Sequence, residues 1–333
     1  MNGNRIVLAG NIIADNVKMI PVWPEKGMLA PIRSMRRSVG GSVCNTGITL
    51  KTLGPSLEVA ALGKVGMDDA GTFVLGELGR RGIDVSLVAR TDAAPTTFTD
   101  CMTLTTTGER TFFNMHGADS LLSPEDVDPR SLDCAVFHLG YLLLLDGLDA
   151  ADGDYGTKAA RLLAKVQAAG IKTSIDIVSD QSGRFEQIVR PALKYCDYCV
   201  VNEIEASRAT GVDKDDMRGL CEGLMSLGVR ECAVVHRPEG SAALDRGGRF
   251  ATIGSLALPD GWIVGSTGAG DAFCAGMLYS FIAGMSPEEG MRLASCAAAC
   301  NLSVADSVSG ARSLAETLEL GKRFERRNVC WST

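Results

Sequence analysis

The chain has 333 residues, of which 46% are apolar and 22% charged, and its 33 Lys and Arg against 40 Asp and Glu give a formal charge of −7. This is the composition of a globular protein with material for a sizeable core, and it excludes collagen, coiled-coil and long disordered architectures. The acidic balance lacks the basic surplus that binding to a phosphate backbone requires, so nucleic acid is not an expected partner.

The chain lacks the patterns of membrane and secreted proteins. Its apolar runs fall short of the roughly 18 residues of a membrane span. The stretch at 1–13 predicts a first strand, because no small-residue cleavage site follows it. We therefore expect a cytoplasmic protein with no membrane partner. The 11 cysteines are scattered over apolar segments of a chain too large to need crosslinks, so we expect reduced core thiols.

Short apolar runs alternate with helical stretches along most of the chain. We expect, in order, strand 6–9, helix 43–53, strand 57–62, helix 71–81, strand 135–139, helix 155–169, strand 172–177, helix 185–193, strand 198–201, helices 204–210 and 215–227, strand 232–235, and a hairpin of 242–245 with 250–253. From Asp271 onward the pattern is nearly all helical. Because parallel neighbours need long crossovers, this order predicts a single α/β domain over 1–333, with a doubly wound, mostly parallel sheet and helices on both faces.

Two segments interrupt this alternation. Residues 12–39 are rich in Pro and basic residues, and residues 96–115 alternate Thr with apolar residues as a strand does. Strand-rich excursions that leave the sheet near its first strands predict a small β lid over a cleft.

The densest chemical signal is the glycine-rich stretch 265–271, GSTGAGD, which leads directly into an amphipathic helix. Its small residues leave the backbone amides of Gly268, Ala269 and Gly270 bare at a helix start, which favours anions. A Walker A loop needs Lys where Asp271 stands, and a dinucleotide fingerprint needs Gly where Phe273 stands. Asp271 would repel a resting phosphate, so we interpret it as the base that takes a proton from a hydroxyl attacking that phosphate. The structural alternative is an aspartate that caps the helix.

Further polar groups follow two of the predicted strands or open a helix. Gly40 and Gly41 form a bare turn before the first long helix, and Asn45 lies one helical turn in, which suits the hydroxyls of a polyol. Asn11 and Asp15 follow the first strand at the usual ligand edge of an open α/β sheet. A further pair after a later strand, Asn202 with Glu205, would suit a magnesium ion bound through water.

In this order, these groups resemble the ribokinase-like, or PfkB-type, carbohydrate kinase family over essentially the whole chain. The strongest signature is GAGD at 268–271 with Phe273 and Gly276, supported by GERTF at 108–112 and by Leu53-Gly54. The resemblance implies ATP-dependent transfer of a phosphoryl group to a sugar or nucleoside hydroxyl. It also implies a β lid that often mediates dimers, so a homodimer through the lid is an expectation.

The resemblance implies a role for each group. Asp271 would be the catalytic base, with the amides of Gly268, Ala269 and Gly270 holding the transferring phosphoryl group. Contacts to the acceptor sugar would come from Asn11, Asp15, Gly40, Gly41, Asn45 and Arg110. Magnesium and the ATP phosphates would lie near Asn202 and Glu205. Asp176 matches the family only as a carboxylate at a strand end.

Two positions depart from the family pattern. Relatives usually have Asp where this chain has Gly265, and that Asp commonly helps bind an activating monovalent cation, so Gly265 argues against potassium activation. The strand at 232–235 is usually followed by a phosphate and nucleotide loop, of which only Gly240 matches. His236 or Arg237 would then contact the ATP phosphates, or the loop has lost tight nucleotide binding; the good match of Arg to phosphate favours the first.

Several alternatives remain open at this stage. A nucleoside kinase on the same scaffold would need apolar walls for a base, which Phe98, Phe112, Phe113 and Trp23 could supply. A sugar-binding regulator would also explain the unusual nucleotide loop, although it would not need the base. His116 and His138 belong to no metal-spaced cluster in the sequence, so we expect packed or hydrogen-bonded side chains.

Overall fold

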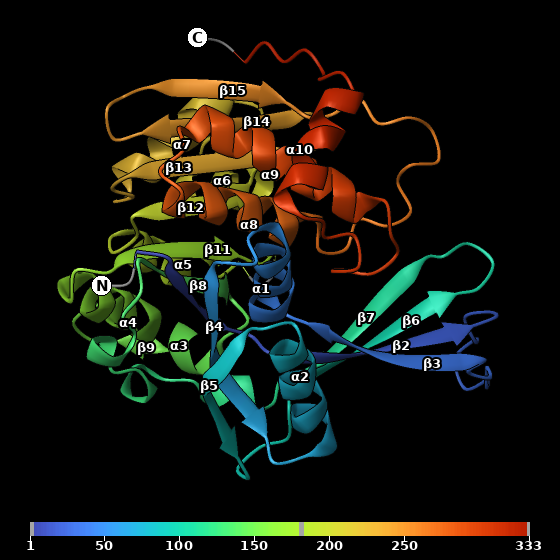
Figure 1. Cartoon of the computed structure of the whole chain (residues 1–333). Coiled ribbons are helices and arrows are strands. Elements are labelled where there is room, and N and C mark those ends of the chain that lie inside the picture. Colours follow the sequence, from blue (N-terminus) through green and yellow to red (C-terminus); the bar gives the residue numbers. More distant parts are fainter. Residues whose placement is uncertain (1–2, 180–182, 332–333) are drawn as a thin grey trace.

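The computed structural model describes residues 3–179 and 183–331, which fold into a large sheet covered by helices and a small projecting arm of strands (Figure 1). Within these residues the large sheet consists, in spatial order, of β15 (Phe250–Gly254), β14 (Gly240–Asp245), β13 (Cys232–Arg237), β12 (Tyr198–Asn202), β11 (Lys172–Ile177), β8 (Val136–Leu142), β1 (Arg5–Gly10), β4 (Glu58–Gly66) and β5 (Asp84–Thr91). Neighbouring strands from β13 to β5 are parallel, whereas β14 and β15 pair antiparallel at one edge. The doubly wound, mostly parallel fold is thus confirmed.

The helices connect the parallel strands and pack on both faces of the sheet (Figure 1). They are α1 (Ser42–Leu53), α2 (Asp69–Arg80), α3 (Asp146–Asp149), α4 (Lys158–Ala168), α5 (Phe185–Leu193), α6 (Glu203–Thr210), α7 (Met217–Ser226), α8 (Ala269–Ile282), α9 (Pro287–Leu302) and α10 (Leu314–Arg323). Short 3-10 turns lie at η1 (Ala118–Leu121), η2 (Pro124–Asp126) and η3 (Pro129–Ser131), and a two-stranded ribbon pairs β9 (Ala151–Asp152) with β10 (Gly156–Thr157).

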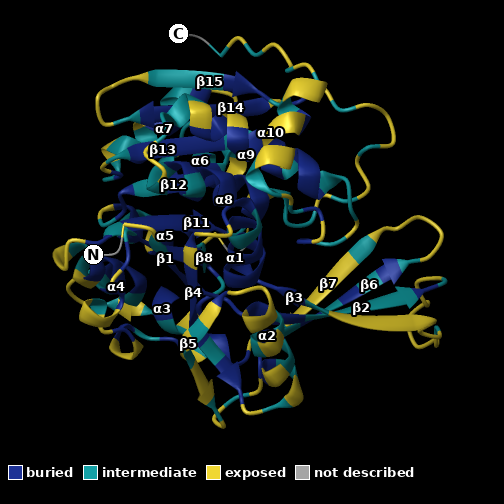
Figure 2. Cartoon of the chain, viewed as in Figure 1, coloured by how far each residue is buried: buried dark blue, intermediate teal, exposed yellow. Residues whose placement is uncertain are grey.

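The core divides into two layers because side chains along a strand point alternately to opposite faces. On β1, Val7 and Ala9 enter one apolar cluster, and Ile6 and Leu8 enter the other. A parallel strand is buried on both faces, so it carries a continuous apolar run instead of an alternating one. Figure 2 shows the resulting buried strands at the centre, with exposure concentrated on the outer helices and loops.

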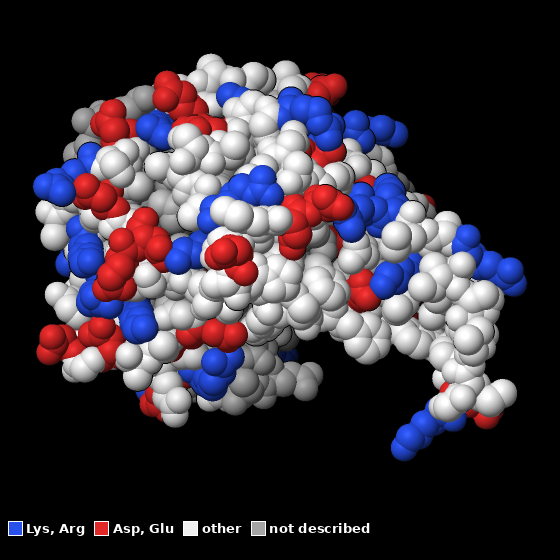
Figure 3. Space-filling view, turned by 90° about the horizontal axis from the view of Figure 1, so that it is seen from below, with Lys and Arg blue, Asp and Glu red and all other residues white. Residues whose placement is uncertain are grey.

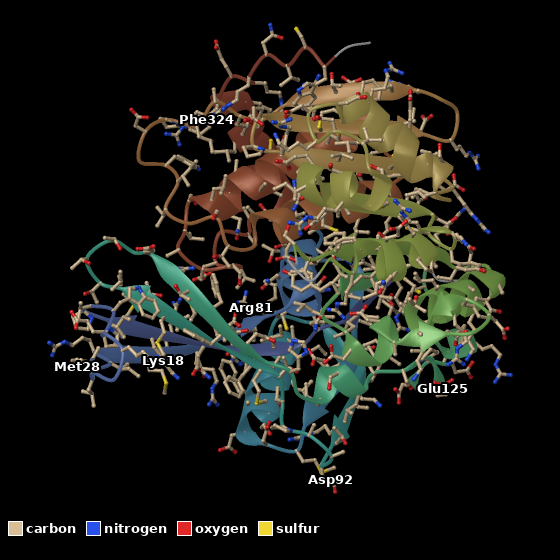
Figure 4. The ribbon with its side chains drawn as sticks, turned by 180° about the vertical axis from the view of Figure 1, so that it is seen from behind. Lys18, Met28, Arg81, Asp92, Glu125 and Phe324 are labelled. Carbon is tan, nitrogen blue, oxygen red and sulfur yellow. The ribbon has the colours of Figure 1, made fainter. Side chains whose placement is uncertain are left out.

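The arm is a separate sheet with the strand order β3 (Ser34–Gly40), β2 (Ile13–Ile20), β6 (Phe98–Leu104) and β7 (Arg110–Met115). Two hairpins build it, and β2 and β6 join them in parallel. Its strands fall inside the segments 12–39 and 96–115 that interrupt the sequence pattern, except that β3 extends one residue further, to Gly40. Figure 4 labels Lys18 and Met28 on this arm, well away from the body of the molecule.

The arm exposes large apolar side chains. Leu29 is 90% exposed, and Phe112 and Phe113 on β7 are each 54% exposed. In the view from below, Lys and Arg side chains lie at several places on the projecting arm, among uncharged surface (Figure 3). Pairing of two copies through this arm stays a prediction.

Three local expectations differ from the structure. Strand β5 at the sheet edge was not expected, because half of its residues are polar. Helix α4 begins at Lys158, later than expected, because the β9–β10 ribbon occupies the residues before it. The end of the chain is not helical throughout, since Arg326 instead forms a bridge with Leu256 beside the sheet. Among the described residues, no helix is long and apolar enough to cross a membrane.

Candidate active site

The parallel strands end at one edge of the sheet and bring distant polar residues together. Tyr141 lies at the end of β8, Asp176 at the end of β11, Asn202 at the end of β12 and His236 near the end of β13. Asn202 and His236 are direct partners in the strand register. Asn11 follows β1 at the same edge. In open α/β sheets this carboxyl edge is where ligands bind.

Asp271 enters this edge from the first turn of α8. The helix begins after Gly268, whose φ of 79° is a left-handed conformation that glycine adopts without strain. A Cβ on Gly268 would lie 2.6 Å from the backbone oxygen of Ser307. Only glycine therefore allows this tight approach between the loop before α8 and the loop after α9.

Two side chains hold the Asp271 carboxyl group. The Asn45 amide, from α1, donates to Oδ2 at 3.0 Å, and the Tyr141 hydroxyl lies 2.9 Å from both carboxyl oxygens. Both partners donate, so both stabilise the ionised form of Asp271. The alternative of a helix cap does not describe this contact pattern, because no capping bond from a side chain is present at the start of α8.

Asp176 organises the residues around Asp271. Its Oδ1 accepts a hydrogen bond from the Tyr141 amide at 2.6 Å, and its Oδ2 accepts one from the Ser42 hydroxyl at 3.2 Å. Tyr141 has a positive φ of 59°, which is uncommon for a residue with a side chain. The bond from Asp176 to its amide helps to hold this conformation and thereby aims the Tyr141 hydroxyl at Asp271.

Burial changes the protonation of Asp271. Removal from water and, second, the negative charge of Asp176 together raise its pKa to about 8, against the lowering effect of the hydrogen bonds from Tyr141 and Asn45. The pKa of Tyr141 is also raised, first by burial and then by Asp271. A carboxyl group with a pKa near the working pH is suited to accept and release a proton.

The loop before α8 only partly matches the expected set of bare amides. The amide of Ala269 donates to the Ser266 oxygen at 3.2 Å, so it is occupied in this conformation. The amides of Gly268 and Gly270 have no hydrogen bond to protein among the described residues. Gly268 and Gly270 line the cavity next to Asp271, so these two amides are available to an anion there.

Most of the residues predicted to contact the acceptor lie on the arm strands and at the turn that precedes α1. The Asp15 carboxylate packs so closely on Gly40 that a Cβ there would collide with it, and burial raises the pKa of Asp15 to about 6. Gly41 has a φ of 84° and leads into α1. Asp15 and Gly40 thus lie on paired strands of the arm, and Gly41 leads into α1, whose Asn45 contacts Asp271.

Asn11 is engaged in the scaffold just after β1. Its amide nitrogen donates to Asp119 at 2.9 Å and to the Leu144 oxygen at 3.1 Å. Its Oδ1 atom is buried without a hydrogen-bond partner within the described part of the chain. Asn11 therefore positions the strand end and keeps one acceptor oxygen unused.

Arg110, on β7 of the arm, extends to the loops before α8 and after α9. Its guanidinium lies 3.3 Å from the Thr267 hydroxyl and donates to the Ala305 backbone oxygen. A second lid residue, Arg36, pairs with Asp306 in the same loop at 3.5 Å. The structure thus connects Arg110 with the loops around the start of α8, a contact that the sequence pattern did not indicate.

A cavity of about 270 Å³ lies on the other side of Asp271. Asp176, Glu205 and Asp271 contribute carboxyl groups to its lining, and no Lys or Arg belongs to that lining within the described chain. Asn202 and Glu205 form a capping box at the start of α6, in which Glu205 accepts from the Asn202 amide at 3.0 Å. Burial raises the pKa of Glu205 to about 7. An acidic cavity without a basic side chain favours a cation together with any phosphate that enters.

The segment 236–240 is divided between the cavity and the surface. His236 lines the cavity, packs 4.7 Å from the Phe273 ring, and has a pKa lowered to about 4 by removal from water, so it is neutral at ordinary pH. Arg237 pairs instead with Asp215 at 2.8 Å and is not among the lining residues. Gly240 opens β14, and a Cβ there would lie 2.4 Å from a backbone oxygen of the hairpin, which explains the glycine without a ligand.

Sequence reasoning missed Tyr141 and Ser42. The only local signal was Gly140-Tyr141 at the end of a predicted strand, and this gave no indication of the positive φ that directs the hydroxyl toward Asp271. Ser42 adjoins the predicted turn at Gly40-Gly41, yet its partner Asp176 is 134 residues away. Both roles depend on the neighbours that the sheet order selects.

Known proteins are similar to this chain in sequence and in fold. A family model described as pfkB family carbohydrate kinase matches residues 6–313. The ribokinase of Arabidopsis thaliana is 26% identical over 309 residues, which cover 91% of this chain and 77% of that protein. The structure of Arabidopsis thaliana ribokinase complexed with ribose and ATP has a TM-score of 0.78 at 21% identity and covers 96% of this chain and 99% of that chain. A putative ribokinase II from E. coli, in complex with ATP and Mg²⁺, has a TM-score of 0.78 at 18% identity, with 96% and 99% covered.

Proposed function

Because the chain belongs to the pfkB family of carbohydrate kinases, we propose that it transfers the γ-phosphoryl group of ATP to a hydroxyl of a sugar or sugar derivative. Members of this family are phosphotransferases with an alcohol group as acceptor. The observation that carries the proposal for this chain is the 3.0 Å contact between Asn45 and Asp271. It connects α1, which follows Gly40 and Gly41, with the acidic cavity that Asp271 lines.

Asp271 acts as the general base in this proposal. Its carboxylate accepts the proton of the attacking hydroxyl while Asn45 and Tyr141 keep both oxygens oriented. The neutralised carboxyl fits its buried surroundings well, since burial favours the protonated form. The base is thus driven to take the proton at the moment of attack.

The cavity side receives the phosphates. The free amides of Gly268 and Gly270 at the positive end of the α8 dipole would hold the oxygens of the transferring group. The carboxyl groups of the lining require that a triphosphate arrives with a divalent cation, and oxygen ligands suit Mg²⁺. Asn202 and Glu205 would hold it through water, and the ion would offset the charge on the phosphates.

The acceptor side receives the sugar. Asp15, Asn45 and the backbone of Gly40 and Gly41 would offer hydrogen-bond acceptors and donors to its hydroxyls. The lid strands continue from these residues, so a sugar would lie beneath them and be shielded from water. His236 is neutral and lines the cavity, which supports a stacking or hydrogen-bonding contact to ATP and not an ion pair.

The test is ADP release from Mg²⁺ and ATP, measured by a coupled assay over ribose, fructose, sugar acids, sugar phosphates and nucleosides. We expect at least one sugar or sugar derivative to accelerate ADP release strongly, because lid closure should make phosphoryl transfer to water slow. Asp271→Asn should abolish the acceleration, whereas Asp92→Asn, at an exposed residue at the lower end of the molecule in Figure 4, should leave it unchanged.

Two results would contradict the proposal. Equal rates of ADP release with and without every acceptor would argue for a binding protein without kinase activity. If only nucleosides accelerated ADP release, the protein would be a nucleoside kinase on the same scaffold and not a sugar kinase.

A further inference from the structure

A compact group of metal-binding side chains lies directly behind the acidic cavity. His138 on β8, Asp176 on β11 and Cys274 on α8 each present one ligand atom, and these atoms lie within 4.8 Å of one another. All three residues are buried. Three elements far apart in the sequence thus converge on one point, so the group is a product of the tertiary fold.

His138 provides an observation that is independent of this spacing. Its Nδ1 atom lies 3.1 Å from the Ser174 hydroxyl, and its Nε2 atom lies 3.5 Å from Asp176 Oδ2. Nε2 is fully buried and has no hydrogen-bond partner in the described residues. When Nδ1 donates to Ser174, Nε2 presents a lone pair toward Asp176. Histidine ligands of metals are commonly held in this way, with the second nitrogen donating to an oxygen.

The three ligand types suit a zinc ion. An imidazole nitrogen, a carboxylate oxygen and a thiolate sulfur are all common ligands of Zn²⁺. Carboxylate and thiolate together balance its double charge, which matters at a buried site. Mg²⁺ prefers oxygen ligands and gains little from the imidazole and the thiolate. The three side chains therefore favour Zn²⁺ over Mg²⁺.

The site also has an entry path. Asp176 and Cys274 line the cavity next to Asp271, whereas His138 lies behind them. An ion could enter from the cavity, bind the three side chains, and keep a fourth position facing the cavity. This pattern of three protein ligands with one open position is typical of zinc sites that carry water or another small ligand.

We propose that His138, Asp176 and Cys274 form a binding site for Zn²⁺ beside the phosphoryl-transfer site. Tetrahedral coordination with bonds of about 2.0 to 2.3 Å places ligand atoms about 3.3 to 3.7 Å apart. The three ligand atoms now lie within 4.8 Å of one another, so side-chain movements of about 1 Å would bring them to this spacing. Binding releases the thiol proton of Cys274 to the buffer, and no bond other than S–H is broken.

Occupation of the site would affect the kinase centre. Asp176 holds the Tyr141 amide, and Cys274 follows Asp271 by three residues on α8. Zinc would draw both residues toward His138 and so disturb the orientation of the Tyr141 hydroxyl and of Asp271. Zinc is thus an inhibitor in this scheme, but its binding does not depend on the kinase reaction.

The test is a titration of the purified full chain with Co²⁺ and Zn²⁺ in the absence of nucleotide. Cys330 is exposed while the other ten cysteines are buried, so all measurements use a Cys330→Ser background. We expect one Co²⁺ per chain, with the near-ultraviolet charge-transfer absorption that a cobalt–thiolate bond produces, and displacement of this cobalt by Zn²⁺. Cys274→Ala should remove the absorption, and Cys221→Ala, at a buried cysteine of α7, should retain it.

A second variant keeps the thiol and removes the nitrogen. His138→Gln should weaken Zn²⁺ binding by more than the roughly 10 to 100-fold that changes around metal ligands cost. Zn²⁺ should also raise the Tm of the Cys330→Ser protein and leave the Tm of the His138→Gln protein unchanged. Absence of cobalt–thiolate absorption in the parent, or equal Zn²⁺ affinity after loss of either ligand, would overturn the proposal. These readouts do not use phosphoryl transfer, so they are independent of the proposed function.

Discussion

Replacement of Tyr141 by Phe tests how the structure controls the base. The Tyr141 hydroxyl lies 2.9 Å from both oxygens of Asp271 and donates to a buried carboxyl group. A hydrogen bond to a charged group contributes roughly 1.5 to 3 kcal/mol, and one pKa unit corresponds to about 1.4 kcal/mol. Loss of the hydroxyl should therefore raise the pKa of Asp271 by about 1 to 2 units. The positive φ at this position is the same for Phe as for Tyr, so the backbone strain does not change.

The expected signature is a shift along the pH axis. The base must be ionised, so kcat/KM should rise with pH through the pKa of the free enzyme, which for Asp271 is about 8. In Tyr141→Phe the midpoint should move up by about 1 to 2 units, and the rate at neutral pH should fall about 10 to 100-fold. At alkaline pH most of this loss should be recovered, because the remaining carboxylate is a stronger base.

The assay is the pH profile of kcat/KM with the best acceptor at saturating Mg²⁺ and ATP. Tyr155→Phe is the matched control, since Tyr155 packs on Tyr195 at 5.7 Å and does not contact Asp271. A variant whose activity falls equally at every pH, with an unchanged midpoint, would refute the reasoning. Tyr141 would then position the substrate and not set the pKa of Asp271.

Three other perturbations test the remaining parts of the site. Asp271→Asn should fold and bind sugar but lose about 10² to 10⁴ in turnover. The pKa of Asp271 is about 8 in the native protein against an ordinary value of 3.8, so Asp271 lowers the free energy of unfolding as pH rises between these values. In thermal melts, the Tm of the Asn variant should therefore rise relative to the Tm of the native protein from pH 5 to pH 8. Turnover should change little when potassium is replaced by a large inert cation at constant ionic strength, because Gly265 offers no carboxylate to bind potassium. Gly265→Asp should introduce some potassium dependence. Strong activation of the native protein by potassium would contradict this expectation. Arg110→Met and Thr267→Val should each raise the ratio of ATP hydrolysis to sugar phosphorylation. Thr267→Val should add little to Arg110→Met, because the Arg110 variant already loses the Thr267 contact together with the Ala305 contact; full additivity of the two effects would speak against this coupling.

The sequence alone predicted the architecture. Apolar runs of strand length alternate with helical stretches, and burial on both faces makes the runs on β1 and β8 continuous. The same reasoning failed at β5, where polar residues at a sheet edge weaken the apolar signal. It also extended α4 too far, because the β9–β10 ribbon has no pattern of its own.

The candidate site was predicted in part for a related reason. Asp271, Gly268 and Gly270 lie within one short motif, and Gly40, Gly41 and Asn45 lie within another, so local spacing already indicated their chemistry. At Arg237 the sequence shows a good phosphate partner but not the nearby Asp215 that pairs with it in the structure. A single side chain can face either way from a strand end, and only its neighbours decide which.

What the sequence by itself determined are the properties that depend on near neighbours: the order of strands and helices, the two glycine turns, and the family signature at 268–271. The tertiary structure alone decided which distant groups meet. Asn45 and Asp271 are 226 residues apart, and Tyr141 and Asp271 are 130 apart. The pKa of Asp271 follows from these meetings, because burial and the charge of Asp176 set it and neither is encoded near residue 271. A motif thus specifies which polar groups lie close together along the chain, whereas their electrostatic environment arises only when the carboxyl ends of the strands converge at one edge of the sheet.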